Sequence, residues 1–269
     1  MPPSVAIVVP IYQEHLSSDE QLSLRHLLHF LSDYDLYSMV PRGRPVFDIL
    51  AKKALFQPEA FINRDSYSHL LVSPEFYETF ESYEYILIYQ LDCLVFSDQL
   101  AYWCAKGYDY IGAPLFRDKA DPGKGLSRTG NGGFSLRKTS AFLRVLSSPT
   151  TNRGVTALFR QLSTGSLQDL EHLPAPARLM KTLSVLRELR RGVKWYADHY
   201  TLNEDLFWSD RAKLFWPDFQ VAPVEESLKF AFERHPRYCF HLAGGHMPFG
   251  CHAWAKYERS FWSPHLLND

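Results

Sequence analysis

Residues 85–96 read YILIYQLDCLVF, an apolar run that is interrupted by one amide, Gln90, and one carboxylate, Asp92. The first five residues are aromatic or branched aliphatic, which is typical of a short strand buried on both faces of a sheet. Because an unpaired carboxylate is costly to bury among apolar residues, we expect Asp92 at the carboxyl end of this strand, where it can meet a cation or hydrogen-bond donors. Ligands of open α/β sheets bind at that edge. The segment therefore predicts a central strand that leads into a functional site.

Strand and helix patterns alternate on both sides of this segment, which predicts an α/β fold with a mostly parallel, Rossmann-type central sheet flanked by helices. We expect one domain over residues 1–269, with a helical insertion at about 149–196. The other expected strands are Val5–Pro10, Asp35–Val40, Tyr108–Ala113 and Gly133–Leu136, with a short one at Phe61–Ile62. The expected helices are Asp19–Leu31, Phe47–Phe56, Ser73–Phe80 and Lys138–Leu146, and Asp118–Gly132 is expected to be a mobile loop.

The overall charge excludes some classes of partner. The chain has 29 basic and 30 acidic residues, a net charge of -1, so it carries no global field that would attract nucleic acid.

Its four cysteines form no CxxC pair, so neither a structural zinc site nor a disulfide framework is indicated. The N-terminal MPPSVAIVVPIY lacks a basic region, and its apolar run is too short for a signal peptide, so we expect a cytoplasmic protein.

A basic stretch runs from Arg178 to Lys194 in the expected helical insertion. Six basic residues stand there against one acid, Glu188, which gives a local charge of +5. One interpretation is a solvated helix face, the usual meaning of a charge run. The other is a surface that meets an anionic acceptor or a membrane, which would place the protein peripherally at the inner membrane.

The segment GNGGFSLR, residues 130–137, is the second candidate for a functional role. Three glycines around Asn131 permit positive φ angles and a close approach of the backbone to a ligand. A tight turn into a strand would need the same residues. The segment is not a P-loop, because no Lys followed by Ser or Thr comes after the glycines.

Two further segments carry acids and histidines. Asn203, Glu204 and Asp205 open an apolar helical run: either the asparagine caps the helix and the acids complement its dipole, or one carboxylate is a general base at the sheet edge. His246 and His252 lie in the Gly- and Pro-rich segment GGHMPFGCHAW. A histidine in such a loop is usually structural, yet it could also swing onto a metal ion.

Taken together and in order, the motifs YQLDCLVF, YDYIGAP, GNGGFSLR, NED and PFGCHAW resemble the pattern of the DUF5672 family of bacterial proteins. That family is in turn similar to metal-dependent glycosyltransferases of the GT-A fold. The resemblance runs from the first strand to about Tyr257, and residues 149–196 are its least diagnostic part. It implies a GT-A-like fold, a nucleotide-sugar donor and a divalent cation, Mn or Mg.

The resemblance also implies a donor site. The end of the first strand matches the place where GT-A enzymes hold the base and ribose. Gln90 stands in place of the first acid of the DXD motif. From there its amide could hydrogen-bond the ribose, although it adds no charge. The glycine-rich segment resembles the part that lines the donor sugar and acceptor, with the backbone amides of Gly132 and Gly133 available for hydroxyl groups. The donor-binding residues implied are Pro10, Ile11, Tyr12, Gln90, Asp92, Asn131, Gly132 and Gly133.

The metal and catalytic residues implied lie in three separate motifs. Asp92 matches the last acid of the DXD motif, which holds the cation, and His252 matches the C-terminal histidine that completes the metal shell in several GT-A families. NED resembles the xED motif, in which the aspartate deprotonates the acceptor hydroxyl. That role falls on Asp205, with Glu204 as the neighbour that binds sugar hydroxyls instead.

The sequence therefore predicts a glycosyltransferase that moves a sugar from a nucleotide-sugar donor to a hydroxyl of a glycan or lipid-linked glycan in surface polysaccharide biosynthesis. A base opposite the leaving group would give inversion, and its absence would favour a retaining route. A non-catalytic carbohydrate-binding or assembly protein of the same fold is the first alternative, which Gln90 favours. A metal-dependent phosphoesterase using Asp92, Asp205 and His252 is the second, although such enzymes usually need more metal ligands.

Overall fold

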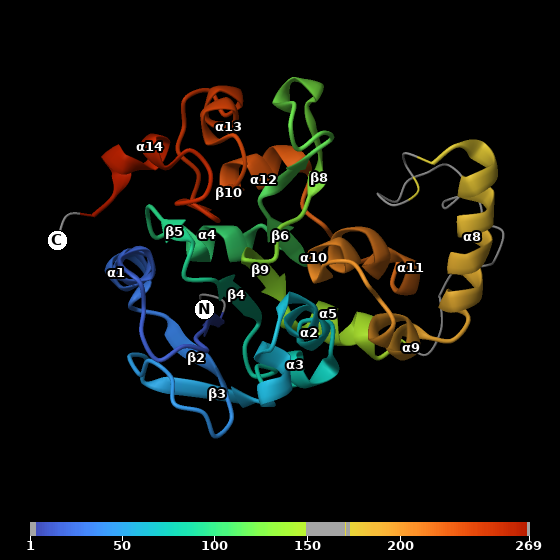
Figure 1. Ribbon diagram of the computed structural model, residues 1–269, viewed down its shortest axis with the longest axis horizontal. Helices are drawn as coiled ribbons and strands as arrows, with labels where there is room; N and C mark the ends of the chain where they lie inside the picture. The colour runs from blue at the N-terminus through green and yellow to red at the C-terminus, as the bar shows by residue number, and fades with distance from the viewer. Residues whose placement is uncertain (1–3, 149–169, 171–172, 268–269) are drawn as a thin grey trace.

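A six-stranded sheet forms the centre of the computed structural model, which describes residues 4–148, 170 and 173–267 (Figure 1). The strand order is β3-β2-β1-β4-β9-β6. All strands run parallel except β9, which is antiparallel to both β4 and β6. The strands are β1 (Val5–Pro10), β2 (Asp35–Pro41), β3 (Lys52–Phe56), β4 (Tyr85–Tyr89), β6 (Tyr110–Gly112) and β9 (Phe134–Lys138). The predicted α/β fold with a mostly parallel central sheet is therefore confirmed.

The reversed strand β9 brings the glycine-rich segment to the carboxyl edge of the sheet. Phe134, the first residue of β9, pairs with Tyr89, the last residue of β4. The next backbone pair continues this contact, because the N–H of Gln90 donates to the carbonyl of Gly133 over 2.9 Å. Thus the two predicted site segments, which are about forty residues apart in the chain, meet where β4 ends and β9 begins.

Alternate residues of β1 enter two different hydrophobic cores, as expected for a strand buried on both faces. Val5, Ile7 and Val9 pack in the core that contains α1 (Ser18–Leu31), α4 (Leu100–Ala105) and α12 (Val224–Phe230). Ala6 and Val8 pack in the core on the other face. The helices that contribute to this other core are α2 (Arg64–Leu70), α3 (Pro74–Glu78), α5 (Thr139–Leu146), α8 (Ala175–Leu189), α9 (Val193–Asp198), η3 (Phe207–Arg211) and α11 (Ala212–Phe215).

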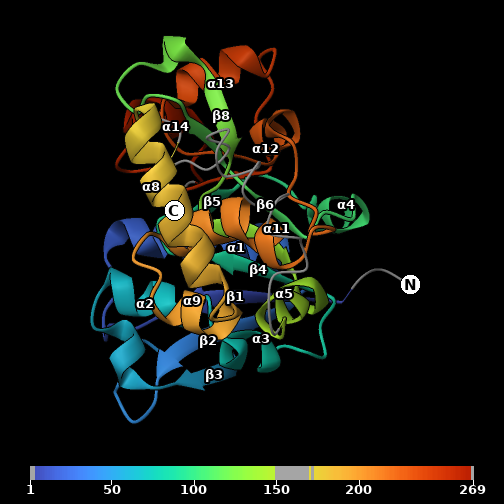
Figure 2. The same ribbon diagram turned by 90° about the vertical axis from the view of Figure 1, so that its right-hand side faces the viewer.

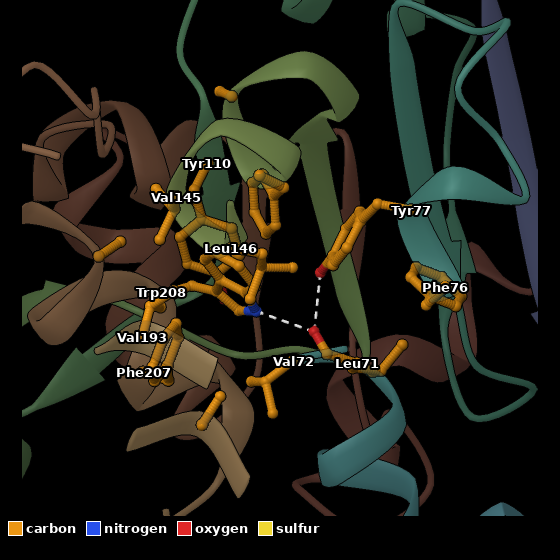
Figure 3. Close-up of a cluster of buried hydrophobic side chains, with 14 of the residues drawn as sticks. Leu71, Val72, Phe76, Tyr77, Tyr110, Val145, Leu146, Val193, Phe207 and Trp208 are labelled. Carbon is orange, nitrogen blue, oxygen red and sulfur yellow. Dashed lines mark hydrogen bonds between the residues drawn. The ribbon is translucent and has the colours of Figure 1, made fainter. Parts of the chain in front are cut away.

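Two hydrogen bonds to one carbonyl lie in the core that contains Ala6 and Val8 (Figure 3). The indole N–H of Trp208 donates to the carbonyl oxygen of Leu71 over 3.1 Å, and the hydroxyl of Tyr77 donates to the same oxygen over 2.9 Å. All three residues are buried. Since α10 (Glu204–Leu206) directly precedes η3, these contacts fix the helix that carries the two candidate acids.

The C-terminal part of the chain lies against the carboxyl edge of the large sheet (Figures 1 and 2). A small sheet here has the strand order β10-β11-β5, and a hairpin pairs β7 with β8. The C-terminal elements are β10 (Ala231–Phe232), α13 (Pro236–Leu242), β11 (Gly250–Cys251), α14 (Arg259–Trp262) and η4 (Ser263–His265). The small sheet and the hairpin also contain elements from the first half of the chain: β5 (Leu94–Val95), β7 (Pro114–Phe116), η2 (Pro122–Lys124) and β8 (Leu126–Thr129).

Three local predictions are wrong. The helix expected at Phe47–Phe56 is in its last five residues the strand β3, which pairs with β2 and buries Ala54 and Phe56 in alternation. The strand expected at Phe61–Ile62 is replaced by a 3-10 turn, η1 (Pro58–Phe61), since Pro58 suits the first position of a helix. The loop expected at Asp118–Gly132 contains η2 and β8.

The basic stretch is helical, as predicted, in the part that the structure describes. It covers α8 and the start of α9, and Figure 1 shows α8 standing at one side of the molecule, away from the central sheet. Thr182, Val185 and Leu189 form its buried face. The rest of the expected insertion, residues 149–169 and 171–172, lies outside the described residues. Among the described helices, none combines the length and the apolar character that crossing a membrane requires.

Candidate active site

A cleft follows the carboxyl edge of the large sheet, and it consists of two adjoining hollows. The first, of about 450 Å³, is lined by residues that include Pro10, Tyr12 and Asp92. The second, of about 290 Å³, is lined by residues that include Asp205 and His252. Arg64, Tyr67 and Gln90 line both hollows. The structure therefore brings the end of the first strand, the central segment, NED and the C-terminal histidine into one place.

The first hollow has an aromatic wall. The ring of Tyr12 is 58% exposed, and its centroid lies 6.3 Å from that of Phe61. The two rings are tilted by 41° to each other, and the exposed ring of Tyr12 offers a face on which a planar ring such as a nucleobase can stack. Ile11, by contrast, is 1% exposed and packs in the core, while its N–H donates to the carbonyl of Met39. Of the predicted base-binding residues, Pro10 and Tyr12 line the hollow, whereas the side chain of Ile11 faces the core.

Asp92, which lines the first hollow, and His252, which lines the second, lie against each other where the two hollows meet. Oδ1 of Asp92 lies 3.3 Å from Nε2 of His252, and Oε1 of Gln90 lies 3.2 Å from the same nitrogen. The small sheet creates this contact, because Cys251 of β11 pairs with Leu94 of β5 and so places His252 beside the segment that precedes β5. The carboxylate, the imidazole and the amide oxygen thus converge from two segments more than 150 residues apart.

These groups fit a divalent cation. Cis ligands at about 2.1–2.2 Å from an octahedral ion stand about 3 Å from each other, close to the separations found here. The carboxylate of Asp92 is half exposed, so it can also meet groups of a bound ligand. Cys93 lies near them, but its buried Sγ donates to the carbonyl of Gly133 and burial keeps the pKa of its thiol well above the usual range. Asp92, His252 and Gln90 are therefore the candidate ligands, and the thiol of Cys93 beside them is bonded to the backbone.

Sequence reasoning missed one acid of the site, Glu233. Its Oε1 lies 3.5 Å from Nδ1 of His252, on the side of the ring opposite to Asp92. The two carboxylates outweigh burial and raise the pKa of His252 to about 10, and His252 in turn lowers the pKa of both acids against the effect of their burial. The sequence marks Glu233 only as an acid directly after the apolar run Phe230–Phe232, the same pattern that leads into Asp92. It was overlooked because β10 has only two residues.

Asn131 connects the glycine-rich segment to the histidine. It has a φ of 64°, and its Oδ1 accepts hydrogen bonds from the N–H groups of Gly133 (3.0 Å) and Phe134 (3.3 Å). This orients its Nδ2 toward Nδ1 of His252, 2.9 Å away. Because the amide of Gly133 is already bonded to Asn131, the expectation that it is available for sugar hydroxyls is wrong.

The glycines are required by side chains that pack against them. A Cβ at Gly132 would lie 1.7 Å from Oε1 of Glu204, and a Cβ at Gly133 would lie 2.3 Å from Nε2 of His252. Both distances are far below van der Waals contact. The close approach that the glycine pattern predicts is therefore real, but it is an approach to the acid and the histidine of the site.

The two acids of NED lie in different surroundings. Asp205 accepts the N–H of Asn131 at Oδ2 and that of Leu206 at Oδ1, both over 3.0 Å, and it lines the second hollow. Burial nevertheless raises its pKa above the usual range, which makes it a stronger base than an exposed aspartate. Asn203 does not cap α10 with its side chain; its Oδ1 accepts from Arg64 instead. The interpretation of NED as a plain capping motif is therefore wrong for the asparagine.

Glu204 forms a buried ion pair below the hollow. Its Oε1 lies 3.0 Å from Nη2 of Arg137, and their side chains are 7% and 0% exposed. Arg137 also donates to the hydroxyl of Tyr77 and to Oγ of Ser135. Glu204 thus connects α10 to strand β9, a role that the sequence does not reveal, while it still lines the hollow as predicted.

The burial of Glu204 makes the stability of the fold depend on pH. Burial raises the pKa of Glu204 to about 7, although Arg137 acts in the opposite direction, while an unfolded chain has a usual value near 4.5. Between these values the folded chain holds a proton that the unfolded chain has lost, so its free energy of unfolding falls as the pH rises. Relative to Glu204→Gln, we expect wild type to lose up to about 1.4 kcal/mol per pH unit in this window. Urea unfolding of both proteins at pH 5, 6 and 7 measures the difference, and parallel curves would contradict it.

Comparisons with known proteins support a family assignment. A family described as "Protein of unknown function (DUF5672)" matches residues 51–252, three quarters of the chain. No curated protein matches the sequence.

Three solved structures are similar to this chain: two glycosyltransferases and an active-site mutant of LgtC. Mouse xyloside xylosyltransferase 1 in its apo form has a TM-score of 0.45 at 11% identity, over 93% of this chain and 98% of that one. The LgtC mutant has a TM-score of 0.45 at 12% identity, over 92% and 86%. A glycosyltransferase involved in glycosylation of the major capsid of PBCV-1 has a TM-score of 0.42 at 10% identity, over 98% of both chains. Because these TM-scores are below 0.5, the function has to be argued from the residues of the chain.

Proposed function

The chain belongs to the DUF5672 family, and we propose that it is a metal-assisted glycosyltransferase that uses a nucleotide-sugar donor. One observation carries the proposal: Asp92, Gln90 and His252 converge at the carboxyl edge of the sheet, between an aromatic hollow and a hollow that holds Asp205. A cation held there would lie between a site for a base and a site for an acceptor. Nucleotide-sugar transfer needs that order of groups.

The first hollow binds the nucleotide in this proposal. Tyr12 and Phe61 contact the base, Gln90 hydrogen-bonds the ribose or helps to hold the cation, and Asp92 with His252 holds Mn or Mg. When bound, the cation neutralises charge on the departing nucleoside diphosphate. Mn tolerates the imidazole nitrogen better than Mg does.

The second hollow binds the acceptor in this proposal. Asp205 removes the proton of the acceptor hydroxyl, and the amides of Asn131 and Leu206 fix the direction of its carboxylate. A base on the face opposite to the leaving group gives inversion at the anomeric carbon. Glu204 holds the helix that carries Asp205 through its pair with Arg137, and it contacts sugar hydroxyls from the floor of the hollow. The acceptor is a hydroxyl of a glycan, free or lipid-linked, in surface polysaccharide biosynthesis.

Calorimetric titration with a panel of nucleoside diphosphates, with Mn²⁺ and with a chelator in its place, tests the proposal. We expect one nucleotide to bind only when Mn²⁺ is present, because the diphosphate completes the metal shell. Binding of inorganic phosphate as tight as that of any nucleotide would favour a phosphoesterase. No binding of any nucleotide, with retained binding of oligosaccharides, would favour the non-catalytic carbohydrate-binding protein.

The helix α8 provides a surface for an anionic membrane in this proposal. Leu179, Met180 and Leu183 are 47%, 69% and 49% exposed, and basic side chains flank them. Apolar residues beside basic ones are typical of helices that lie on anionic lipid. This contact would bring the active site to lipid-linked acceptors.

Replacing four of the exposed basic residues of this stretch tests the contact. The variant changes Lys181, Arg187, Arg190 and Lys194 to Gln. Each basic residue near an anionic surface contributes about 1 kcal/mol, so we expect at least about a tenfold loss of binding to phosphatidylglycerol vesicles, with phosphatidylcholine vesicles as the control. The melting temperature should stay the same because these side chains are exposed. Unchanged vesicle binding would identify the stretch as a solvated face, and loss of the fold would assign it to the core.

A further inference from the structure

Glu233 contacts the histidine of the site but has no part in the transfer described above. Its carboxylate faces Nδ1 of His252 over 3.5 Å, and both side chains are 17% exposed. The backbone creates this contact. Strands β10 and β11 run parallel with Phe232 opposite Cys251, so the residues that follow the two strands lie side by side. The placement of Glu233 is therefore as fixed as the small sheet itself.

The two nitrogens of His252 face different partners. Nε2 faces Oδ1 of Asp92 and Oε1 of Gln90, whereas Nδ1 faces Glu233 and Asn131. A neutral imidazole carries one hydrogen, and a nitrogen that binds a cation must use its lone pair. A cation on the Asp92 side thus requires the hydrogen on Nδ1, together with an acceptor that receives it.

Asn131 favours the opposite arrangement. Because its Oδ1 accepts two backbone N–H groups, the atom that it turns toward Nδ1 is the donor Nδ2. With Asn131 alone, Nδ1 would accept a hydrogen bond, and the ring hydrogen would lie on Nε2, where it excludes a cation. Among the residues that the structure places against Nδ1, the acceptor is the carboxylate of Glu233.

We propose that Glu233 is a positioning residue that receives the Nδ1 hydrogen of His252 and so turns the lone pair of Nε2 toward Asp92 and a divalent cation. The cation itself rests on the proposed function. The carboxylate also gives the amide hydrogens of Asn131 a second acceptor, so Nδ1 is released from accepting them. Partners of this kind behind a metal-binding histidine change metal affinity about 10- to 100-fold.

Titration of the full-length protein with Mn²⁺, followed by the electron paramagnetic resonance signal of the free ion, tests this role. The titration is done with Mn²⁺ alone and with the nucleoside diphosphates of the panel. Glu233→Gln keeps the size of the side chain but can present a donor to Nδ1, and we expect it to weaken Mn²⁺ binding about 10- to 100-fold. Glu225→Gln, at an exposed position of α12, is the matched control and should bind as wild type does.

A rescue separates positioning from a general effect on folding. Adding Asn131→Asp to Glu233→Gln returns a carboxylate to the side of Nδ1, and we expect Mn²⁺ affinity to recover at least partly. Nitrogen-15 chemical shifts of the His252 ring, assigned with His252→Gln, report directly which nitrogen carries the hydrogen. On addition of diamagnetic Zn²⁺ we expect wild type to keep the hydrogen on Nδ1 and to lose the one on Nε2, and we expect a larger share of Nε2–H in Glu233→Gln under the same condition.

The outcomes are distinguishable. Equal Mn²⁺ affinity of wild type and Glu233→Gln, with the hydrogen on the same nitrogen in both, would overturn the role of Glu233 and leave the transferase proposal intact. If wild type binds no Mn²⁺ under any condition, the metal site of the proposed function fails and the inference about Glu233 fails with it. Weakened binding that the double variant does not recover would show a structural effect and would also overturn the positioning role.

Discussion

Asp205→Asn is expected to reduce glycosyl transfer by about 10²- to 10⁴-fold, the usual contribution of a general base. Asparagine keeps the shape and can still accept the N–H groups of Asn131 and Leu206, so the second hollow should remain formed. Because the first hollow lies on the other side of Gln90, binding of the nucleoside diphosphate should not change. The measurement is the transfer rate at saturating donor, together with calorimetry of the nucleotide.

Asp198→Asn, on the exposed end of α9, is the control for this substitution and should transfer at the wild-type rate. If Asp205→Asn has full activity, either another residue is the base or the leaving phosphate acts as base. In the second case the reaction retains the configuration of the anomeric carbon. If the variant instead loses nucleotide binding together with transfer, Asp205 supports the whole cleft and is not a specific base.

Asp92→Ala is expected to remove the metal-dependent part of nucleotide binding, a loss of at least about 100-fold, since even an indirect metal partner can change affinity that much. The residue supplies the one carboxylate that faces Nε2 of His252 in the described structure. Its other contacts are few, so the fold should persist. Calorimetry with Mn²⁺ and with chelator measures both parts of the affinity.

Asp98→Asn, six residues further along the same segment, is the control and should bind the nucleotide as wild type does. The same titration with Asp92→Ala in chelator should match wild type in chelator, because only the metal-dependent part is lost. Unchanged affinity of Asp92→Ala in Mn²⁺ would contradict the assignment of this residue as a ligand.

The sequence predicts those strands in which the pattern of apolar residues matches the pattern of burial in the fold. Val5–Pro10 and Tyr85–Tyr89 are buried on both faces, and their continuous apolar runs show it. Phe47–Phe56 was predicted wrongly because a short apolar segment is compatible with both a helix and a strand, and only pairing with β2 decides. Fold class could therefore be predicted, while the ends and types of short elements depend on distant partners.

The candidate site could be predicted in part for the same reason. Asp92, Asp205 and His252 stand in recognisable local patterns, and the structure brings them to one cleft. The contact of Gly132 with Glu204 joins residues about seventy positions apart, so the local sequence cannot show it. Glu233 follows a strand of two residues that exists only because β11 pairs with it.

The distance along the chain between the two halves of the site has a kinetic consequence. Gln90 and His252 are 162 residues apart, and the backbone pairs of β5 with β11 must form before they can meet. Contacts between such distant segments form slowly, because a long loop has to close first. The large sheet can assemble from the first half of the chain, whereas the cleft is completed only when the C-terminal segment docks. During refolding, recovery of nucleotide binding should therefore lag behind recovery of secondary structure, and a ligand that binds the finished cleft would slow the release of that segment.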